Sequence, residues 1–147
     1  MSLSQIFDIA GSGMAAQSLR LNTTASNIAN ADSASSSTDE VYRARKPIFA
    51  AVQQDAMQQA LGGGFINEQA GSKGVQVKGV IESDAPLDMR FQPDHPLADE
   101  RGYVMYPNVN IVEEMADMMS ASRSFQTNVD VMDAAKTMMQ RLLTLGQ

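Results

Sequence analysis

The sequence predicts a mainly α-helical protein in which two long terminal helices flank a small β-rich insert. At both ends, apolar residues recur at alternating steps of four and three, the spacing that forms the seam of a coiled coil. Between the ends, short β-prone runs are separated by turn-forming proline and glycine. We therefore divide the chain into an N-terminal helix at 1–31, a Ser-rich hinge at 32–41, a β-rich insert at 42–107 and a C-terminal helix at 108–147.

The N-terminal helix is expected to span residues 3–28. Ser2 and Gln5 form a capping-box pattern at its start, because their side chains can satisfy backbone N–H groups of the first turn. Gly11 and Gly13 weaken the helix by about 1 kcal/mol each relative to alanine. Six of its eight heptad positions are apolar, and we expect these to contact other subunits: Leu3, Phe7, Ala10, Met14, Leu21 and Ile28.

The C-terminal helix has the stronger pattern. Asn110 and Glu113 form its cap, and Lys136 and Arg141 lie near its other end, where the helix dipole favours cations. Eight of its ten heptad positions are apolar and are expected at the subunit interface: Ile111, Met115, Met118, Phe125, Val129, Met132, Met139 and Leu143. A second stripe adjoins them: Val131, Ala135, Met138, Leu142 and Leu145.

These two helices are expected to pair as a coiled-coil hairpin that packs on other copies. An intramolecular core is the alternative, but the combined apolar faces are wider than a two-helix hairpin can cover. Methionine supports packing against several neighbours, because it fills irregular contacts and six of the eleven lie in residues 109–147.

The insert is expected to contain three short strands. The β-prone runs cover residues 42–49, 75–81 and 103–106, and turn signals lie at 85–86 and 93–96.

Composition argues against several classes of function. The net charge is −6 and no basic stripe is present, so nucleic acid is not expected as a partner. The absence of cysteine excludes disulfides, thiolate metal sites and cysteine nucleophiles. No apolar run approaches the roughly 18–20 residues of a transmembrane helix. Because no Lys or Arg precedes Arg20 and no continuous apolar core follows, a cleaved signal peptide is not expected.

No catalytic constellation is found in the sequence, so we expect no enzyme activity, small-molecule substrate, metal or cofactor. His95 is interpreted as a turn residue beside solvated acids rather than a ligand or base. A hydrolase using Asp88 and Asp94 is a weaker alternative.

Two groups of polar residues have alternative interpretations. The basic cluster Arg43, Arg45 and Lys46 is either a solvated strand edge or a contact with an acidic neighbouring subunit. Asn27 and Asn30 either end the first helix or include one buried amide that fixes the register between subunits.

Residues 25–33, Ala-Ser-Asn-Ile-Ala-Asn-Ala-Asp-Ser, resemble the N-terminal signature of flagellar rod and hook proteins. Residues 108–115 and 122–128 resemble the C-terminal helix signature of the same family. The middle, at 42–49 and 92–99, is similar to proximal-rod members, although Asp94 stands where that family pattern usually has Gly. The positions that carry the terminal motifs are Asn27, Ala29, Asn30, Asn108, Asn110, Glu114, Arg123 and Asn128.

The resemblance implies a structural subunit of the bacterial flagellum, located in the basal-body rod in the periplasm. Its partners would be other rod subunits and copies of itself, which stack into a helical tube that transmits torque. It would pass through the flagellar type III export apparatus without cleavage. The alternative is a coiled-coil subunit or adaptor of another type III export apparatus, against which the β-rich insert argues.

Overall fold

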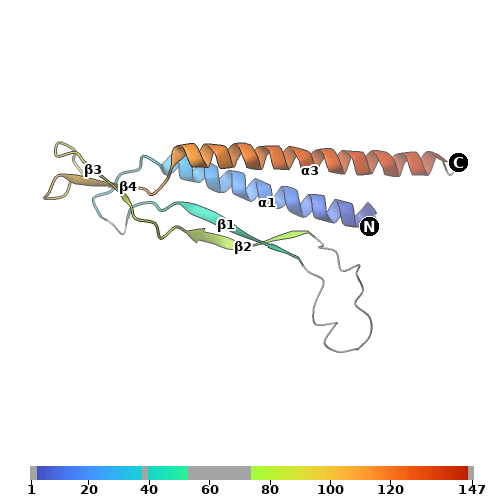
Figure 1. Ribbon diagram of the computed structural model, residues 1–147, viewed down its shortest axis with the longest axis horizontal. Helices are drawn as coiled ribbons and strands as arrows, with labels where there is room; N and C mark the ends of the chain where they lie inside the picture. The colour runs from blue at the N-terminus through green and yellow to red at the C-terminus, as the bar shows by residue number, and fades with distance from the viewer. Residues whose placement is uncertain (1–2, 38–39, 53–73, 146–147) are drawn as a thin grey trace, which may run out of the picture. The chain divides into compact units, whose positions relative to one another are not determined.

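The computed structural model describes residues 3–37, 40–52 and 74–145. No helix among these residues is long and apolar enough to cross a membrane. The described residues form two long helices with short strands between them, which confirms the predicted mainly helical fold with a small β insert (Figure 1). In chain order the elements are α1 (Leu3–Asn30), β1 (Arg45–Ala51), β2 (Val75–Glu82), β3 (Asp88–Phe91), β4 (Tyr103–Tyr106) and α3 (Ile111–Leu145).

Helix α1 continues two residues beyond its expected end and stops at Asn30. Gly11 and Gly13 lie inside it without breaking it. At its end, the Asn30 amide donates to the Ser26 carbonyl (2.8 Å), and the Asn30 carbonyl accepts the N–H of Ser33 (3.1 Å). The second bond satisfies a carbonyl that has no partner within the helix, because the helical ladder stops at Asn30.

The strands form two small sheets, one of β1 and β2 and one of β3 and β4. Strands β3 and β4 are antiparallel, with Asp88 opposite Tyr106 and Phe91 opposite Tyr103. In the connecting turn Gly102 has a φ of 81°, and the Asp99 carboxylate accepts the N–H of Tyr103 (2.8 Å). Strand β3 was not predicted, although its alternation of charged and apolar side chains is the pattern of a half-buried strand.

Two compact units make up the described chain, and each contains part of both helices. The first unit holds residues 19–37, 40–48 and 79–122, and the second holds 3–18, 49–52, 74–78 and 123–145. In the first unit, Arg20 of α1 pairs with Asp117 of α3 (Nη2 to Oδ1, 2.7 Å). In the second unit, Gly13 of α1 faces Asn128 of α3.

The buried side chains of both helices are small or polar. On α1 they are Ala10, Ala16, Thr23, Thr24 and Asn27, and on α3 they are Glu114, Ala121 and Ala135. Thr23 is satisfied within its own helix, since its hydroxyl donates to the Leu19 carbonyl (2.7 Å). The fully buried positions of both helices are therefore occupied by small or polar side chains, whereas larger apolar residues such as Met14 and Phe125 are half-buried.

The most deeply buried positions of α3 lie one residue before some of the predicted heptad positions. Glu114, Ala121 and Ala135 are buried and Asn128 is half-buried, so these four positions follow a seven-residue repeat. The predicted subunit interface includes Met115, one residue later, which is 51% exposed in the single chain. Its assignment to a contact with other subunits therefore stays a prediction.

Substitutions at Gly11 and Gly13 distinguish the effect of helix propensity on stability from the effect of packing between the helices. A Cβ added at Gly13 would lie 3.0 Å from Nδ2 of Asn128, whose amide is held by a bond to the Ser124 carbonyl (3.0 Å). A Cβ added at Gly11 would meet nothing within 4 Å. We expect Gly11→Ala to stabilise the chain by about 1 kcal/mol and Gly13→Ala to lose that gain through overpacking. Thermal unfolding followed by circular dichroism compares them; equal increases in Tm would contradict the packing at Gly13.

Candidate functional site

The segment 42–46, which includes the start of β1, is held to α1 by one buried amide. We call this segment the strap. Asn27 is 1% exposed. Its Nδ2 donates to the Arg45 carbonyl (2.8 Å), and its Oδ1 accepts the N–H of Arg45 (2.9 Å) and the hydroxyl of Tyr42 (2.8 Å). The Asn27 side chain therefore bonds both backbone groups of Arg45, as a neighbouring β-strand does.

A second asparagine holds the strap from the segment that precedes α3. Oδ1 of Asn108 accepts the N–H of Ala44 (2.8 Å), and its Nδ2 donates to the carbonyls of Ser83 (3.2 Å) and Ala85 (2.9 Å). The N–H of Ser83 in turn donates to the Ala44 carbonyl (2.8 Å). Asn27 and Asn108 come from the two terminal motifs, so both motifs meet at the strap within the first unit.

The structure assigns different roles to the two asparagines of the N-terminal motif. Asn30 closes α1, as one interpretation expected, whereas Asn27 is buried and bonds its own chain. The contact between Asn27 and Arg45 was not predicted, because the two residues are 18 positions apart in sequence and no local pattern links them.

The basic cluster has partners within the chain. Arg43 donates to the Ser83 carbonyl (3.2 Å). Both Nε and Nη2 of Arg45 contact Oε1 of Glu82 (3.2 and 3.1 Å), and Lys46 pairs with Glu113 (3.1 Å). These two ion pairs are about half-exposed, so each contributes little to stability.

The pKa of Lys46 is raised above its ordinary value of 10.5, chiefly by the hydrogen bond to the Glu113 carboxylate, while burial opposes the shift. The charges of Glu113, Glu114 and Asp117 add to the increase. A raised folded pKa means that the stabilisation is fully present below the unfolded pKa and is lost as pH rises through the folded value.

Replacing Glu113 by Gln removes the largest cause of that shift. We expect the pKa of Lys46 in Glu113→Gln to fall toward 10.5, which an NMR titration of the lysine side chain measures. The free energy of unfolding at neutral pH should change by no more than about 1 kcal/mol, because the pair is half-exposed. An unchanged Lys46 titration would contradict this ion pair.

The start of α3 is capped by Asn110. Its Oδ1 accepts the N–H of Val112 (3.1 Å) and of Glu113 (3.4 Å), and its carbonyl accepts the N–H of Glu114 (3.0 Å). The remaining motif positions lie further along the helices: Ala29 and Arg123 are exposed and Asn128 is half-buried.

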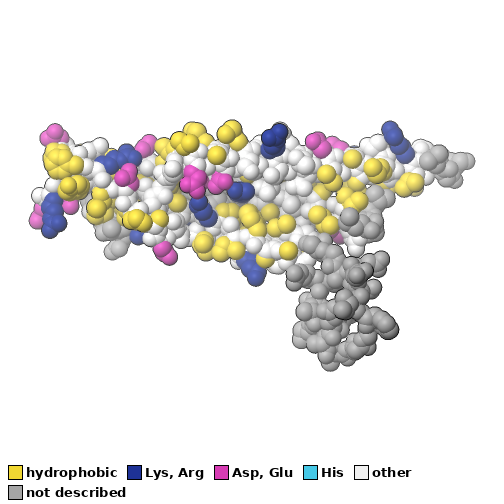
Figure 2. All heavy atoms as spheres, viewed as in Figure 1, with side chains coloured by type: hydrophobic (Ala, Val, Ile, Leu, Met, Phe, Trp, Pro, Cys, Tyr) yellow, Lys and Arg dark blue, Asp and Glu magenta, His cyan; other side chains and the backbone are white. Residues whose placement is uncertain are grey.

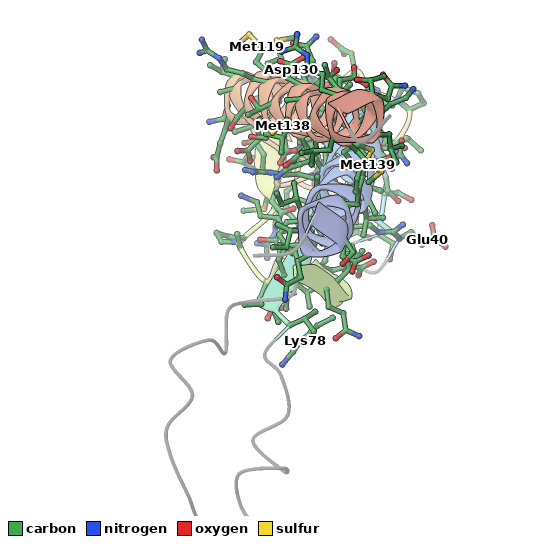
Figure 3. The ribbon with its side chains drawn as sticks, turned by 90° about the vertical axis from the view of Figure 1, so that its right-hand side faces the viewer. Glu40, Lys78, Met119, Asp130, Met138 and Met139 are labelled. Carbon is green, nitrogen blue, oxygen red and sulfur yellow. The ribbon has the colours of Figure 1, made fainter. Side chains whose placement is uncertain are left out.

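Large apolar side chains remain exposed on α3 at both of its ends. Near its start they are Ile111, Val112, Met115 and Met119, and near its end they are Val131, Met138, Met139, Leu142 and Leu143. Figure 2 shows yellow apolar side chains over the first of these stretches. Figure 3 labels Met119 and Asp130 on one side of α3. Val112 and Met119 were missed by the heptad series, and Asp130 lies on the intervening polar part of the helix.

The other predicted interface residues are less exposed. Met118, Phe125, Val129 and Met132 of α3 are half-buried, as are Phe7, Met14, Leu21 and Ile28 of α1. Ala10 is buried, and the side chain of Leu3 lies outside the described part of the structure.

Two family models match the ends of the chain. The model of flagella basal body rod proteins matches residues 7–34, and the model of the C-terminal part of flagellar basal body rod FlgEFG proteins matches residues 100–145. Along its whole length, the chain is 50% identical over 148 residues to the flagellar basal-body rod protein FlgC of Salmonella typhimurium, with 100% of both chains covered. The chain belongs to the FlgC family of flagellar basal-body rod proteins.

More distant FlgC proteins match over the same length. The FlgC protein of Yersinia enterocolitica is 45% identical over 147 residues, with 100% of both chains covered. That of Borreliella burgdorferi is 34% identical over 154 residues, covering 100% of this chain and 99% of that protein. These matches confirm the resemblance inferred from the terminal motifs, and they identify the chain as a structural rod protein rather than an enzyme.

Several polar side chains of this FlgC-family chain are bonded to near neighbours in sequence. Nδ1 of His95 accepts the N–H of Leu97 (3.2 Å), so the ring is part of a turn as expected, and Asp88 pairs with Arg90 (3.0 Å). Among the described residues, no group of three or more His, Cys, Asp or Glu side chains is arranged to hold a metal ion. An open depression of about 430 Å³ is lined by Asn22, Thr23, Ser26, Arg45, Val80 and Glu82.

Proposed function

We propose that this chain assembles with copies of itself and with other rod subunits to form the proximal part of the flagellar rod. In this proposal, residues 1–31 and 108–147 pair as a coiled-coil hairpin and stack into a helical tube. The insert at 42–107 follows the hinge at 32–41 and is held against the helices through the strap. The tube crosses the periplasm and transmits torque from the motor.

The observation that carries this proposal is the exposed apolar surface of α3. The fully buried side chains of α1 and α3 are small or polar, and large side chains such as Met115 (51% exposed) and Leu143 (69% exposed) stay open to solvent in the single chain. Exposed apolar surface of this extent is a mark of protein–protein contact. Heptad spacing over the same helix favours other helices as the partners.

We further propose that the subunit reaches the rod through the flagellar type III export apparatus without signal cleavage. A subunit that finishes folding on assembly suits such a route, because much of its apolar surface is covered only by neighbours.

The test is complementation of a strain that lacks its own FlgC-family subunit. We expect the chain to restore motility and to be found in isolated basal bodies at its full, uncleaved mass. Recovery of the chain in a different export complex, with no motility, would favour the alternative adaptor role and contradict this proposal.

A further inference from the structure

The hairpin of β3 and β4 has one packed face and one open face. On the packed face, Val104 is 0% exposed and Tyr106 is also buried. On the other face, Met89 and Phe91 are 62% and 63% exposed, and Tyr103 lies opposite Phe91 with the two ring centroids 5.3 Å apart. Figure 2 shows apolar side chains gathered over this hairpin, with acidic side chains beside them.

An open apolar face on a two-stranded hairpin needs a covering element. Two strands alone are marginally stable in water and gain stability when an apolar face packs against a helix. Strand alternation puts Met89, Phe91, Tyr103 and Met105 on the same side, so a covering helix would meet four large apolar side chains.

The charge around this open face restricts which helix fits. The turn between β3 and β4 carries the acids Asp94, Asp99 and Glu100 against the single base Arg101, beside His95. The apolar stretch at the start of α3 is flanked by Glu113 and other acids, so it would be repelled. The end of α3, residues 134–145, carries Lys136 and Arg141 and no acid.

We propose that the open face of the β3–β4 hairpin docks residues 138–143 at the end of α3 of a second copy. Met138, Leu142 and Leu143 supply the exposed apolar side chains. In this docking Arg141 is the base that meets the acidic turn. The inference rests on the proposed rod function, because it needs copies to lie beside each other. Since it joins two different surfaces, the contact is heterologous and leaves a free hairpin and a free helix end for further copies.

Cysteine cross-linking tests this contact directly, because the chain has no cysteine of its own. A chain with Phe91→Cys and Leu142→Cys carries one thiol on each proposed surface. In basal bodies oxidised under mild conditions, we expect bands of two, three and more chains. Each single variant can give a dimer at most. The matched control combines Phe91→Cys with Gln126→Cys, a position on the exposed polar part of α3, and should give no ladder.

Four outcomes would overturn the proposal: rods that assemble without a ladder, an intramolecular disulfide, a cross-link to a protein of different mass, or an equal ladder from the control. Met89→Cys with Met138→Cys is the second pair if the first does not assemble.

Charge exchange gives a readout that does not depend on cysteine. Arg141→Glu and Glu100→Arg should each lower the number of assembled subunits several-fold, and the double variant should recover most of the loss. Lack of recovery would also overturn the docking. Failure of the unmodified chain to enter rods would instead refute the proposed function, so the two failures are distinguishable.

Discussion

Replacing Asn27 by Leu is expected to detach the strap from α1. The two side chains are similar in size, so the substitution removes hydrogen bonds with little change in volume. It leaves the N–H and carbonyl of Arg45 without their buried partner, whereas the Tyr42 hydroxyl keeps its contact with Oγ of Ser26 (3.2 Å). Each unpaired backbone group costs about 1–3 kcal/mol, so we expect a total loss of about 2 kcal/mol or more.

Two measurements report the loss of stability in Asn27→Leu. Denaturant unfolding gives the change in stability, and amide hydrogen exchange at Arg45 reports the strap itself, because that N–H is bonded to Asn27. Asn22→Leu is the matched control, since Asn22 is exposed on the same helix. Asn108→Leu should open the strap from its other side. Wild-type protection of the Arg45 amide in Asn27→Leu would show that the strap is held by other contacts.

The helices could be predicted from the sequence because their signals are local. The four-and-three spacing and the Asn110 cap lie within a few residues of the positions they determine. The most deeply buried positions of α3 were harder to predict, because the heptad rule selects large apolar residues. Glu114 and Ala121 are buried although one is charged and the other is small, and a pattern of hydrophobicity does not distinguish such residues from a solvated face.

The residues of the site were predicted, but their contacts were not. The terminal motifs identified Asn27 and Asn108. Asn27 bonds Arg45, which is 18 positions away in sequence, and Asn108 bonds Ala44, which is 64 positions away. The same is true of Lys46, whose partner Glu113 is 67 positions away. Contacts at such separations depend on the fold, and a single sequence carries no pattern that pairs them.

The exposed residues of α3 allow a test in which folding and assembly are separated. Phe125, a central member of the predicted interface, is half-buried in the chain, so a charge there would also weaken the chain's own packing. Met115 belongs to the same predicted interface and is 51% exposed, which makes Met115→Asp the cleaner substitution. In the purified chain we expect its stability to change by no more than about 0.5 kcal/mol.

In the assembled rod the same substitution should have a large effect. It would bury a carboxylate where an apolar side chain meets a neighbouring subunit, and a buried unpaired charge is costly. Because the cost recurs in every copy, we expect Met115→Asp cells to export the subunit, to lack rods and to be non-motile. Gln126→Asp is the matched control, since it introduces the same charge at an exposed polar position of α3 and should leave motility intact. Electron microscopy of basal bodies and a swimming assay measure both variants. If Met115→Asp cells build rods and swim, the exposed start of α3 is not a subunit interface.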